Sequence, residues 1–257
     1  MIEYPQISPY IFELGVIKPT WYGLMYVVGF VLGYALAQYR AKKSANWDRE
    51  EVSNLLTFIM FGVILGGRIG YVLFYGLAFW AHDIWYPLRI TNGGMSFHGG
   101  LLGVIIACLL FARKYQKSLL TVSDFIAPLV PVGLFFGRFG NFINGELWGR
   151  VTDAPWAMVF PTGGPLPRHP SQLYEMALEG LLLFMILWLY STKPRAMGRV
   201  SGLFLMGYGV FRSLVELVRE PDAHLNFIAF NWLTMGQLLS LPMILAGLYL
   251  LLRRVDG

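Results

Sequence analysis

The sequence is poor in charge and in cysteine, and both shortages limit what the protein can be. Only 14% of its 257 residues are charged and 56% are hydrophobic, whereas about 25% charged is usual for soluble proteins. A soluble domain of this length would need more polar surface, so the composition indicates an integral membrane protein. The single cysteine, Cys108, excludes an intrachain disulfide. It lies within an apolar run, where we expect it to pack as a small hydrophobic residue.

The signatures of several enzyme classes are also missing. The chain has no Walker loop, no glycine fingerprint for dinucleotides and no serine-hydrolase elbow, and its histidines form no metal-ligand pattern. We therefore expect no metal, no cofactor and no nucleic acid partner. Residues 1–19 lack the basic start of a cleavable signal peptide. The four histidines all map to outer loops or outer helix ends: His82, His98, His169 and His224.

Seven apolar runs are long enough to cross a bilayer, which takes about 20 residues. They lie near residues 20–39, 52–75, 97–113, 121–140, 172–191, 200–219 and 233–252. We predict an all-α integral membrane protein, one domain over residues 1–257, folded as a seven-transmembrane helix bundle with short outer-side (periplasmic) segments. The fourth run contains Pro128 and Pro131. Prolines interrupt the helical hydrogen bonds, so this run should be covered by protein and not by lipid.

Lysine and arginine are distributed unevenly between the loops, and this sets the orientation. With the N-terminus outside, the inner segments hold twelve of these residues and the outer segments five. The sequence therefore predicts an outer N-terminus and a cytoplasmic C-terminus. The longest connection, residues 141–171, lies outside and is a possible lid.

Charged residues inside the runs gather toward the outer side. An arginine in hydrocarbon costs roughly 2.5–3.5 kcal/mol on insertion scales, and such residues are usually functional. Arg68, Arg138 and Arg212 lie within runs, and a guanidinium fork suits a phosphate. Arg68 could equally be a structural partner within the protein. Because the inner half is almost purely apolar, the pattern favours a one-sided site for an anionic phospholipid at the outer leaflet.

Other polar residues surround these arginines in the predicted bundle. Ser96 could cap the third run, which places His98 in its first turn as a candidate proton acceptor or as a structural residue. Ser171 could cap the fifth run in the same way. The remaining candidates are hydrogen-bonding groups or carboxylates that could orient the arginines: Asn141, Asn144, Tyr208, Glu146, Glu175 and Glu216.

The stretch Gly137-Arg-Phe-Gly-Asn-Phe-Ile-Asn-Gly-Glu-Leu-Trp-Gly149 resembles the signature of the bacterial prolipoprotein diacylglyceryl transferase family. Further blocks resemble that family in the same order. They are Trp21-Tyr-Gly-Leu-Met-Tyr26, Leu65-Gly-Gly-Arg-Ile-Gly-Tyr71, Gly93-Gly-Met-Ser-Phe-His-Gly-Gly100, Arg168-His-Pro-Ser-Gln-Leu-Tyr-Glu175 and Gly207-Tyr-Gly-Val-Phe-Arg-Ser-Leu-Val-Glu216. The resemblance runs from about residue 20 to 250 and is weakest over residues 151–167.

The resemblance implies transfer of a diacylglyceryl group from phosphatidylglycerol to the lipobox cysteine of a prolipoprotein, with release of glycerol 1-phosphate. It implies a multi-pass, monomeric protein of the bacterial inner membrane whose active site faces the outer leaflet. The implied catalytic residues are Tyr22, His98, Arg138 and Arg212. The implied phosphatidylglycerol-binding residues are Arg138, Asn141, Glu146, Gly149, Tyr208, Arg212 and Glu216.

Two other classes are less consistent with the residues. A lipid carrier would need a polar path to the inner leaflet, and the third, fifth and seventh runs offer none. A phosphatidyltransferase of the kind that binds metal through repeated aspartates would need those aspartates, which are missing.

Overall fold

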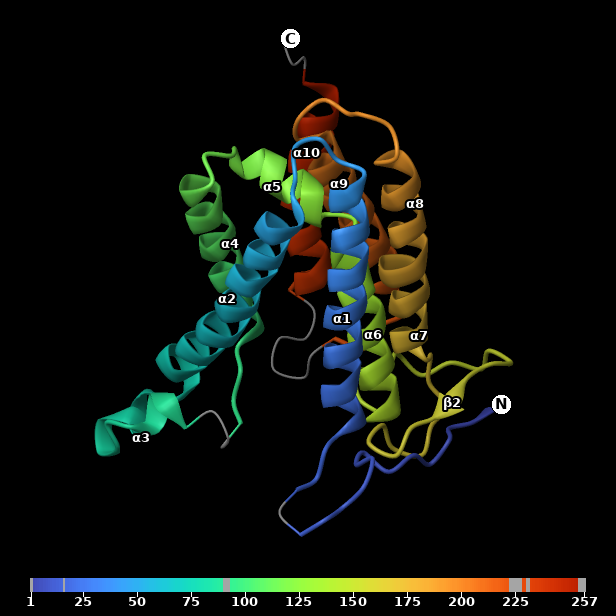
Figure 1. Ribbon diagram of the computed structural model, residues 1–257. Coiled ribbons are helices and arrows are strands. Elements are labelled where there is room, and N and C mark those ends of the chain that lie inside the picture. Colours follow the sequence, from blue (N-terminus) through green and yellow to red (C-terminus); the bar gives the residue numbers. More distant parts are fainter. Residues whose placement is uncertain (1, 16, 90–92, 222–227, 230–231, 254–257) are drawn as a thin grey trace. The chain divides into compact units, whose positions relative to one another are not determined.

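The computed structural model describes residues 2–15, 17–89, 93–221, 228–229 and 232–253. His224 and the C-terminal Arg254, which contributed to the sequence predictions, lie outside the described residues. The described chain is mostly helical (Figure 1) and divides into two compact units. One unit comprises residues 36–123, and the other comprises residues 1–35 with 124–257.

The unit of residues 36–123 is built on two long helices, α2 (Arg49–Tyr75) and α4 (Phe97–Lys114). Helix α2 begins at a capping box in which the Asp48 carboxylate accepts from the Glu51 amide at 2.7 Å. Helix α4 begins at Ser96, whose hydroxyl accepts from the Gly99 amide at 3.2 Å, so the predicted cap is confirmed. Helix α3 (Leu77–His82) and the 3₁₀ turn η1 (Tyr86–Leu88) lie in the connection between them.

Helices α2 and α4 meet along a seam of glycines. A Cβ built on Gly103 would lie 2.0 Å from the Gly62 carbonyl oxygen, and one on Gly66 would lie 2.4 Å from the Gly99 carbonyl oxygen. Real Cβ atoms cannot approach so closely, and the backbones touch only because these side chains are absent. The close helix contact predicted from the four-residue glycine spacing in the second run is confirmed.

We expect Gly103→Ala to destabilise this helix pair by about 1–3 kcal/mol, because the added methyl must push the two backbones apart. The matched control is Gly100→Ala in the same helix, where the nearest atom to a new Cβ is at an ordinary 3.7 Å. Thermal unfolding of the detergent-solubilised protein measures both. Equal melting temperatures for the two variants would show that the seam can open without cost.

Arg68 lies in this unit with only 4% of its surface exposed. Among the described residues its guanidinium donates only to backbone carbonyls, at 2.9 Å to Pro87, 2.6 Å to Tyr86 and 2.6 Å to Gly93, with longer bonds to two more. Of the two roles that the sequence left open for Arg68, phosphate ligand or structural partner, these contacts indicate the structural one. Arg68 ties the connection after η1 to the end of α2.

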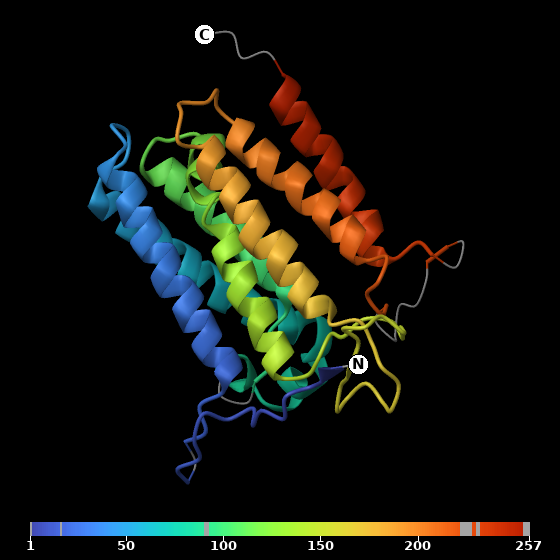
Figure 2. The ribbon, with the colours of Figure 1, turned by 90° about the vertical axis from the view of Figure 1, so that its right-hand side faces the viewer.

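The other unit contains the first part of α1 (Trp21–Lys42) and the later helices. These are α6 (Val130–Ile143), α7 (Ser171–Glu175), the π-helix η3 (Met176–Leu182), α8 (Leu183–Tyr190), α9 (Arg199–Val215) and α10 (Met235–Leu252). Figure 2 shows α6, α8, α9 and α10 side by side. A core of Ala127, Leu183, Leu187 and Val200 packs between them. The Asp124 carboxylate caps α9 by accepting from the Gly198 and Ser201 amides at 2.6 and 2.7 Å.

Five helical stretches of the described chain are long and apolar enough to cross a membrane: α1, α2, α4, the run from α7 to α8, and α10. Helix α5 (Leu119–Ile126) and α6 form a bent pair that makes a sixth if it is one span. The bend falls between Ile126 and Val130, where Pro128 lies, and the predicted irregularity of the fourth run is confirmed. The chain is therefore an all-helical protein with the composition of a membrane protein.

A small layer of strands and loops adjoins the ends of these helices in the same unit. Strand β1 (Ile2–Glu3) pairs in parallel with β2 (Met158–Val159), with Ile2 opposite Met158. Tyr4 follows β1, and its hydroxyl lies 2.6 Å from the carbonyl oxygen of Phe142 at the end of α6. Burial raises the pKa of Tyr4. The N-terminal arm, residues 2–20, is thus fastened to the C-terminal end of α6.

Candidate active site

Three arginines and three glutamates form a buried charge cluster in the unit that contains α6 to α10. Glu175, at the end of α7, is fully buried and lies between all three arginines. One of its oxygens contacts Nε of Arg138. The other lies 3.0 Å from Nη1 of Arg212 and 3.6 Å from Nε of Arg219. Glu175 is therefore the centre of the cluster.

Two further carboxylates complete the cluster. Glu216 contacts Nη2 of Arg212 one helical turn away and lies 3.4 Å from Nη1 of Arg219. Glu179 is 0% exposed, and its oxygens lie 3.9 Å from Nη2 of Arg138 and Nη1 of Arg212. The π-helix η3 carries Glu179, and such helices occur often at functional sites. Three positive and three negative groups thus offset one another in a place where an unpaired charge would be costly.

Arg138 and Arg212 are the most open members of the cluster. Their side chains are 19% and 12% exposed, against 1% for Glu175. Each guanidinium has five N–H donors, and the carboxylate contacts above use only part of them. The cluster therefore presents two partly occupied forks that can bind an anion such as a phosphate.

The sequence prediction placed Arg138, Arg212 and Glu216 in the site, and the structure brings these three residues together. Glu175 was expected to orient the arginines, and its contacts to Arg138 and Arg212 confirm this. The sequence prediction did not place Glu179 or Arg219 in the site. A signal was present for Glu179, since two carboxylates four residues apart within an apolar run are costly unless they are paired.

Asn141, Asn144 and Glu146 form a second polar group just after Arg138. Oε1 of Glu146 accepts from the Asn141 amide at 2.9 Å and from the Asn144 amide at 3.2 Å. Among the described residues Glu146 pairs with no arginine, so the prediction that it offsets one is wrong. Two nearby amides donate to one of its oxygens instead, because Asn141 lies in the last turn of α6, Asn144 caps its end, and the chain reverses at Gly145, where φ is +64°.

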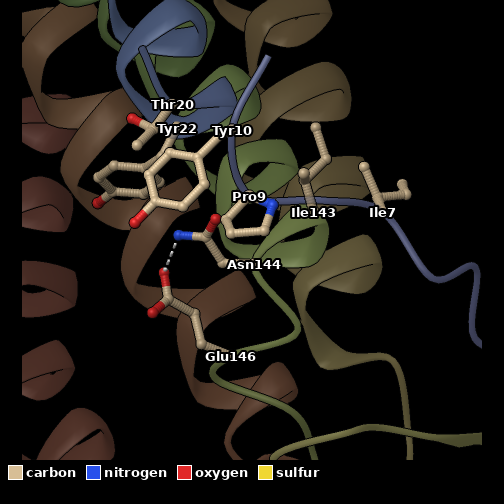
Figure 3. A pocket seen from close by; sticks show the side chains of 8 residues that line it. All are labelled: Ile7, Pro9, Tyr10, Thr20, Tyr22, Ile143, Asn144 and Glu146. Atoms are coloured by element: carbon tan, nitrogen blue, oxygen red, sulfur yellow. Dashed lines mark hydrogen bonds between the residues drawn. The ribbon is translucent and has the colours of Figure 1, made fainter. Parts of the chain in front are cut away.

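Tyr22, in the first turn of α1, lies against the last turn of α6. A Cβ built on Gly140 would lie 2.8 Å from its ring, and its hydroxyl lies 3.1 Å from that of Tyr26. Tyr22 also lines a pocket of 390 Å³ together with Asn144 and Glu146 (Figure 3). The structure thus brings Tyr22 close to two of the predicted site residues.

Gly149 is needed for contact within the protein. A Cβ on Gly149 would lie 2.5 Å from the Val218 carbonyl oxygen and 2.7 Å from Cβ of His169. The backbone at Gly149 therefore approaches the chain itself closely. It joins the outer segment to the end of α9 through the bridge between Gly149 and Arg219.

His169 and Tyr174 lie beside this junction. The Tyr174 hydroxyl accepts from Trp156 at 2.6 Å and lies 3.1 Å from Nδ1 of His169. Burial lowers the pKa of His169, so its neutral form is favoured. Ser171 is not a helix cap as the sequence predicted. Its hydroxyl donates to the Leu147 carbonyl at 2.9 Å, and Pro170 occupies the cap position.

The remaining predicted residues are Tyr208 and His98. Tyr208 lies one turn before Arg212 on α9, half-buried against the core of Leu183 and Leu187 and stacked on Phe204. His98 belongs to the unit of residues 36–123, where it is exposed in the first turn of α4 with its ring against Phe97. That His98 faces the arginine cluster stays a prediction.

Apolar helices of membrane-spanning length and a buried arginine–glutamate cluster together define an α-helical membrane protein with a charged site among its helices. The prolipoprotein diacylglyceryl transferase family matches residues 9–253. The chain belongs to that family.

Similarity to individual relatives extends over nearly the whole chain. A phosphatidylglycerol–prolipoprotein diacylglyceryl transferase of Oleidesulfovibrio alaskensis is 61% identical over 97% of this chain and 94% of its own length. Proteins with the same name from Legionella pneumophila strain Lens and Aliivibrio fischeri are each 56% identical. The Legionella protein matches over 98% of its own length and 97% of this chain. The Aliivibrio protein matches over 91% of its own length and 98% of this chain.

Proposed function

We propose that the protein transfers the diacylglyceryl group of phosphatidylglycerol to the lipobox cysteine of prolipoproteins, the first step of lipoprotein maturation. The name shared by its relatives states the donor and the acceptor. The observation that carries the proposal is the pairing of Arg138 and Arg212 on one buried carboxylate, with part of each guanidinium left open. That arrangement suits the one anionic group of the lipid, its phosphate.

The reaction is an in-line displacement at the glycerol carbon that bears the phosphate. The acceptor thiol loses its proton, and the sulfur forms a bond to this carbon. The bond from the same carbon to the phosphate oxygen breaks, and glycerol 1-phosphate leaves with the electron pair. The product is a thioether. A thiol is a poor nucleophile until it is ionised, with a free pKa of about 8.5, so a base is needed near neutral pH.

The binding roles follow from the charges on each side chain. Arg138 and Arg212 hold the phosphate and stabilise the negative charge that moves onto it. Glu216 and Tyr208 orient Arg212 from one turn on either side. Asn141, Glu146 and Tyr22 bind the glycerol oxygens or the acceptor, and Gly149 positions the outer segment beside them.

We also propose that the chain forms a single monomeric domain with seven spans. Helix α9 has 17 residues, which at 1.5 Å each give about 26 Å, close to the thickness of the hydrocarbon layer. It packs between α8 and α10. With the bent pair as one span, α9 is the seventh.

The loop charges support an outer N-terminus and a cytoplasmic C-terminus in the bacterial inner membrane, with residues 141–171 as a lid on the outer side. An impermeant thiol reagent applied to cells should label Leu166→Cys at once and Ala45→Cys only after the membrane is opened, since both positions are exposed. Labelling of Ala45→Cys in intact cells would show that the topology is the reverse of the one proposed.

One assay tests the activity. Purified protein is incubated with phosphatidylglycerol vesicles and a peptide that carries the lipobox cysteine, beside the same peptide with serine. We expect the cysteine peptide to gain the mass of a diacylglyceryl group while glycerol 1-phosphate appears in equal amount. Release of glycerol 1-phosphate without any peptide product would indicate a phospholipase instead.

We assign the proton transfer to His98, on its place at the exposed start of α4. A general base contributes about 10²–10⁴-fold. His98→Gln should therefore slow transfer by such a factor near neutral pH with little change in lipid binding. The loss should shrink toward about pH 9.5, where the peptide thiol ionises unaided. A loss that is equal from about pH 6 to about pH 9.5 would make His98 a positioning residue.

A further inference from the structure

A pocket lies between the N-terminal arm and the last turn of α6, apart from the arginine cluster. It has a volume of 390 Å³. Ile7, Pro9 and Tyr10 of the arm line it together with Tyr22, and Asn144 and Glu146 lie below them in the view of Figure 3. All of these residues belong to the same compact unit.

The pocket presents polar groups that the protein itself does not use. Oδ1 of Asn144 is buried without a hydrogen-bond partner in the described part of the chain. Glu146 spends one oxygen, Oε1, on both asparagine amides, and its other oxygen accepts no hydrogen bond from any described residue. Buried polar atoms are nearly always paired, so Oδ1 of Asn144 indicates a bound molecule that supplies a donor. Glu146 is half-buried, and its free oxygen lies within reach of the same molecule.

The charge of the pocket argues against the lipid phosphate as that molecule. Glu146 is the one acidic residue among the lining residues described, and those residues include no lysine or arginine. A phosphate would be repelled by the carboxylate. The thiol and backbone amides of a peptide are neutral donors, and they suit the free acceptors of Asn144 and Glu146.

The arm offers a peptide a backbone to pair with. Within the described residues, no backbone hydrogen bond joins residues 5–8 to the rest of the protein, although β1 precedes them and the Pro9 carbonyl accepts from Trp21 at 3.0 Å after them. These four residues are exposed. An unpaired, exposed stretch of this kind can accept an extended segment as an added strand.

The pocket and the arginine cluster adjoin neighbouring turns of α6. Arg138 belongs to the cluster, and Asn141, one turn further along α6, holds Glu146 at the pocket. An in-line displacement needs the nucleophile and the leaving group on opposite sides of the reacting carbon. Two subsites one turn apart, one cationic and one with free acceptors, match that need.

We propose that this pocket is the acceptor subsite, in which the lipobox segment of the prolipoprotein lies along residues 5–8 with its cysteine directed toward Glu146 and Tyr22. This assignment rests on the proposed function. It makes Glu146 a ligand of the peptide, leaves the phosphate to Arg138 and Arg212, and gives the N-terminal arm a part in choosing the acceptor.

The kinetic test fills the pocket from the arm with Ile7→Trp. The matched control is Ile17→Trp on the same arm, since Ile17 is 58% exposed and is not among the residues described as lining the pocket. We expect Ile7→Trp to raise the KM for the peptide at least about tenfold and to leave the KM for phosphatidylglycerol within about twofold. A rise in the lipid KM instead, or an unchanged peptide KM, would overturn the assignment.

A trapping experiment needs no turnover. Ile7→Cys and Ile17→Cys are each made in a Cys108→Ala background and mixed with the lipobox peptide under mild oxidation. A disulfide forms only when the two Cα atoms come within about 7 Å. We expect the peptide to be trapped at position 7, not at 17, and excess serine peptide present from the start to prevent the trapping. Equal trapping at both positions, or none at position 7, would contradict the acceptor subsite. If the wild type transfers nothing to the peptide, the proposed function fails, whichever way the trapping result falls.

Discussion

Arg138→Lys is expected to lower kcat/KM for diacylglyceryl transfer by at least about a hundredfold, although the positive charge is kept. Nε of Arg138 contacts Glu175, Nη2 lies 3.9 Å from Glu179, and the side chain as a whole is 19% exposed. A lysine has one nitrogen and cannot reach the carboxylate and a phosphate with the same fixed geometry. Transfer from phosphatidylglycerol to a lipobox peptide measures the loss.

The control for this substitution is Arg195→Lys. Arg195 is exposed in the loop before α9, where its Nε donates to the Tyr190 carbonyl at 2.9 Å and its guanidinium stacks over the Tyr190 ring. We expect unchanged transfer in that variant. Wild-type turnover in Arg138→Lys would show that the site needs only a charge, and it would remove the argument for two-pronged phosphate binding.

Glu175→Gln is expected to lower both stability and activity. The substitution keeps the shape of the side chain and removes the one negative charge that all three arginines share. Removing one partner of a buried ion pair costs about 3–5 kcal/mol, because the remaining charges stay buried. We expect a clear fall in melting temperature and a loss of transfer, because Arg138 and Arg212 lose the group that fixes their spacing.

Glu220→Gln serves as the control for Glu175. Glu220 also pairs with an arginine, Arg168, at 3.3 Å, but its side chain is 42% exposed. An exposed pair contributes at most about 1 kcal/mol, so this variant should resemble the wild type. If Glu175→Gln is instead stable and binds phosphatidylglycerol more tightly, Glu175 is a competitor of the phosphate and not a support for the arginines.

The helices could be predicted from the sequence because their cause is local. Long apolar runs place α1, α2, α4 and α10 within a few residues of the predicted spans, and Pro128 marks the break between α5 and α6. The glycine spacing in α2 predicted a close helix contact for an equally local reason, since a missing Cβ leaves room for a neighbouring backbone.

The partners of the polar residues could not be predicted, because they depend on tertiary contacts. The sequence shows that Arg68 and Arg138 lie in apolar runs, yet one is surrounded by backbone carbonyls and the other by carboxylates. Glu146 precedes a tryptophan in a motif rich in glycine, and nothing local shows that it faces two asparagines instead of an arginine. The N-terminal arm has no periodic pattern at all, and its place beside α6 emerges only from the pairing of Ile2 with Met158.

The parallel pairing of β1 with β2 also sets an order of events during biosynthesis. Residues 2–3 are made long before the residues they pair with, 158–159. Contacts between such distant segments form late, because a long loop must close before they gain any energy. The arm must therefore wait, unpaired, while the helices between it and β2 are inserted. A nascent chain that is arrested before residue 158 has its first helices but no strand on which the arm can settle.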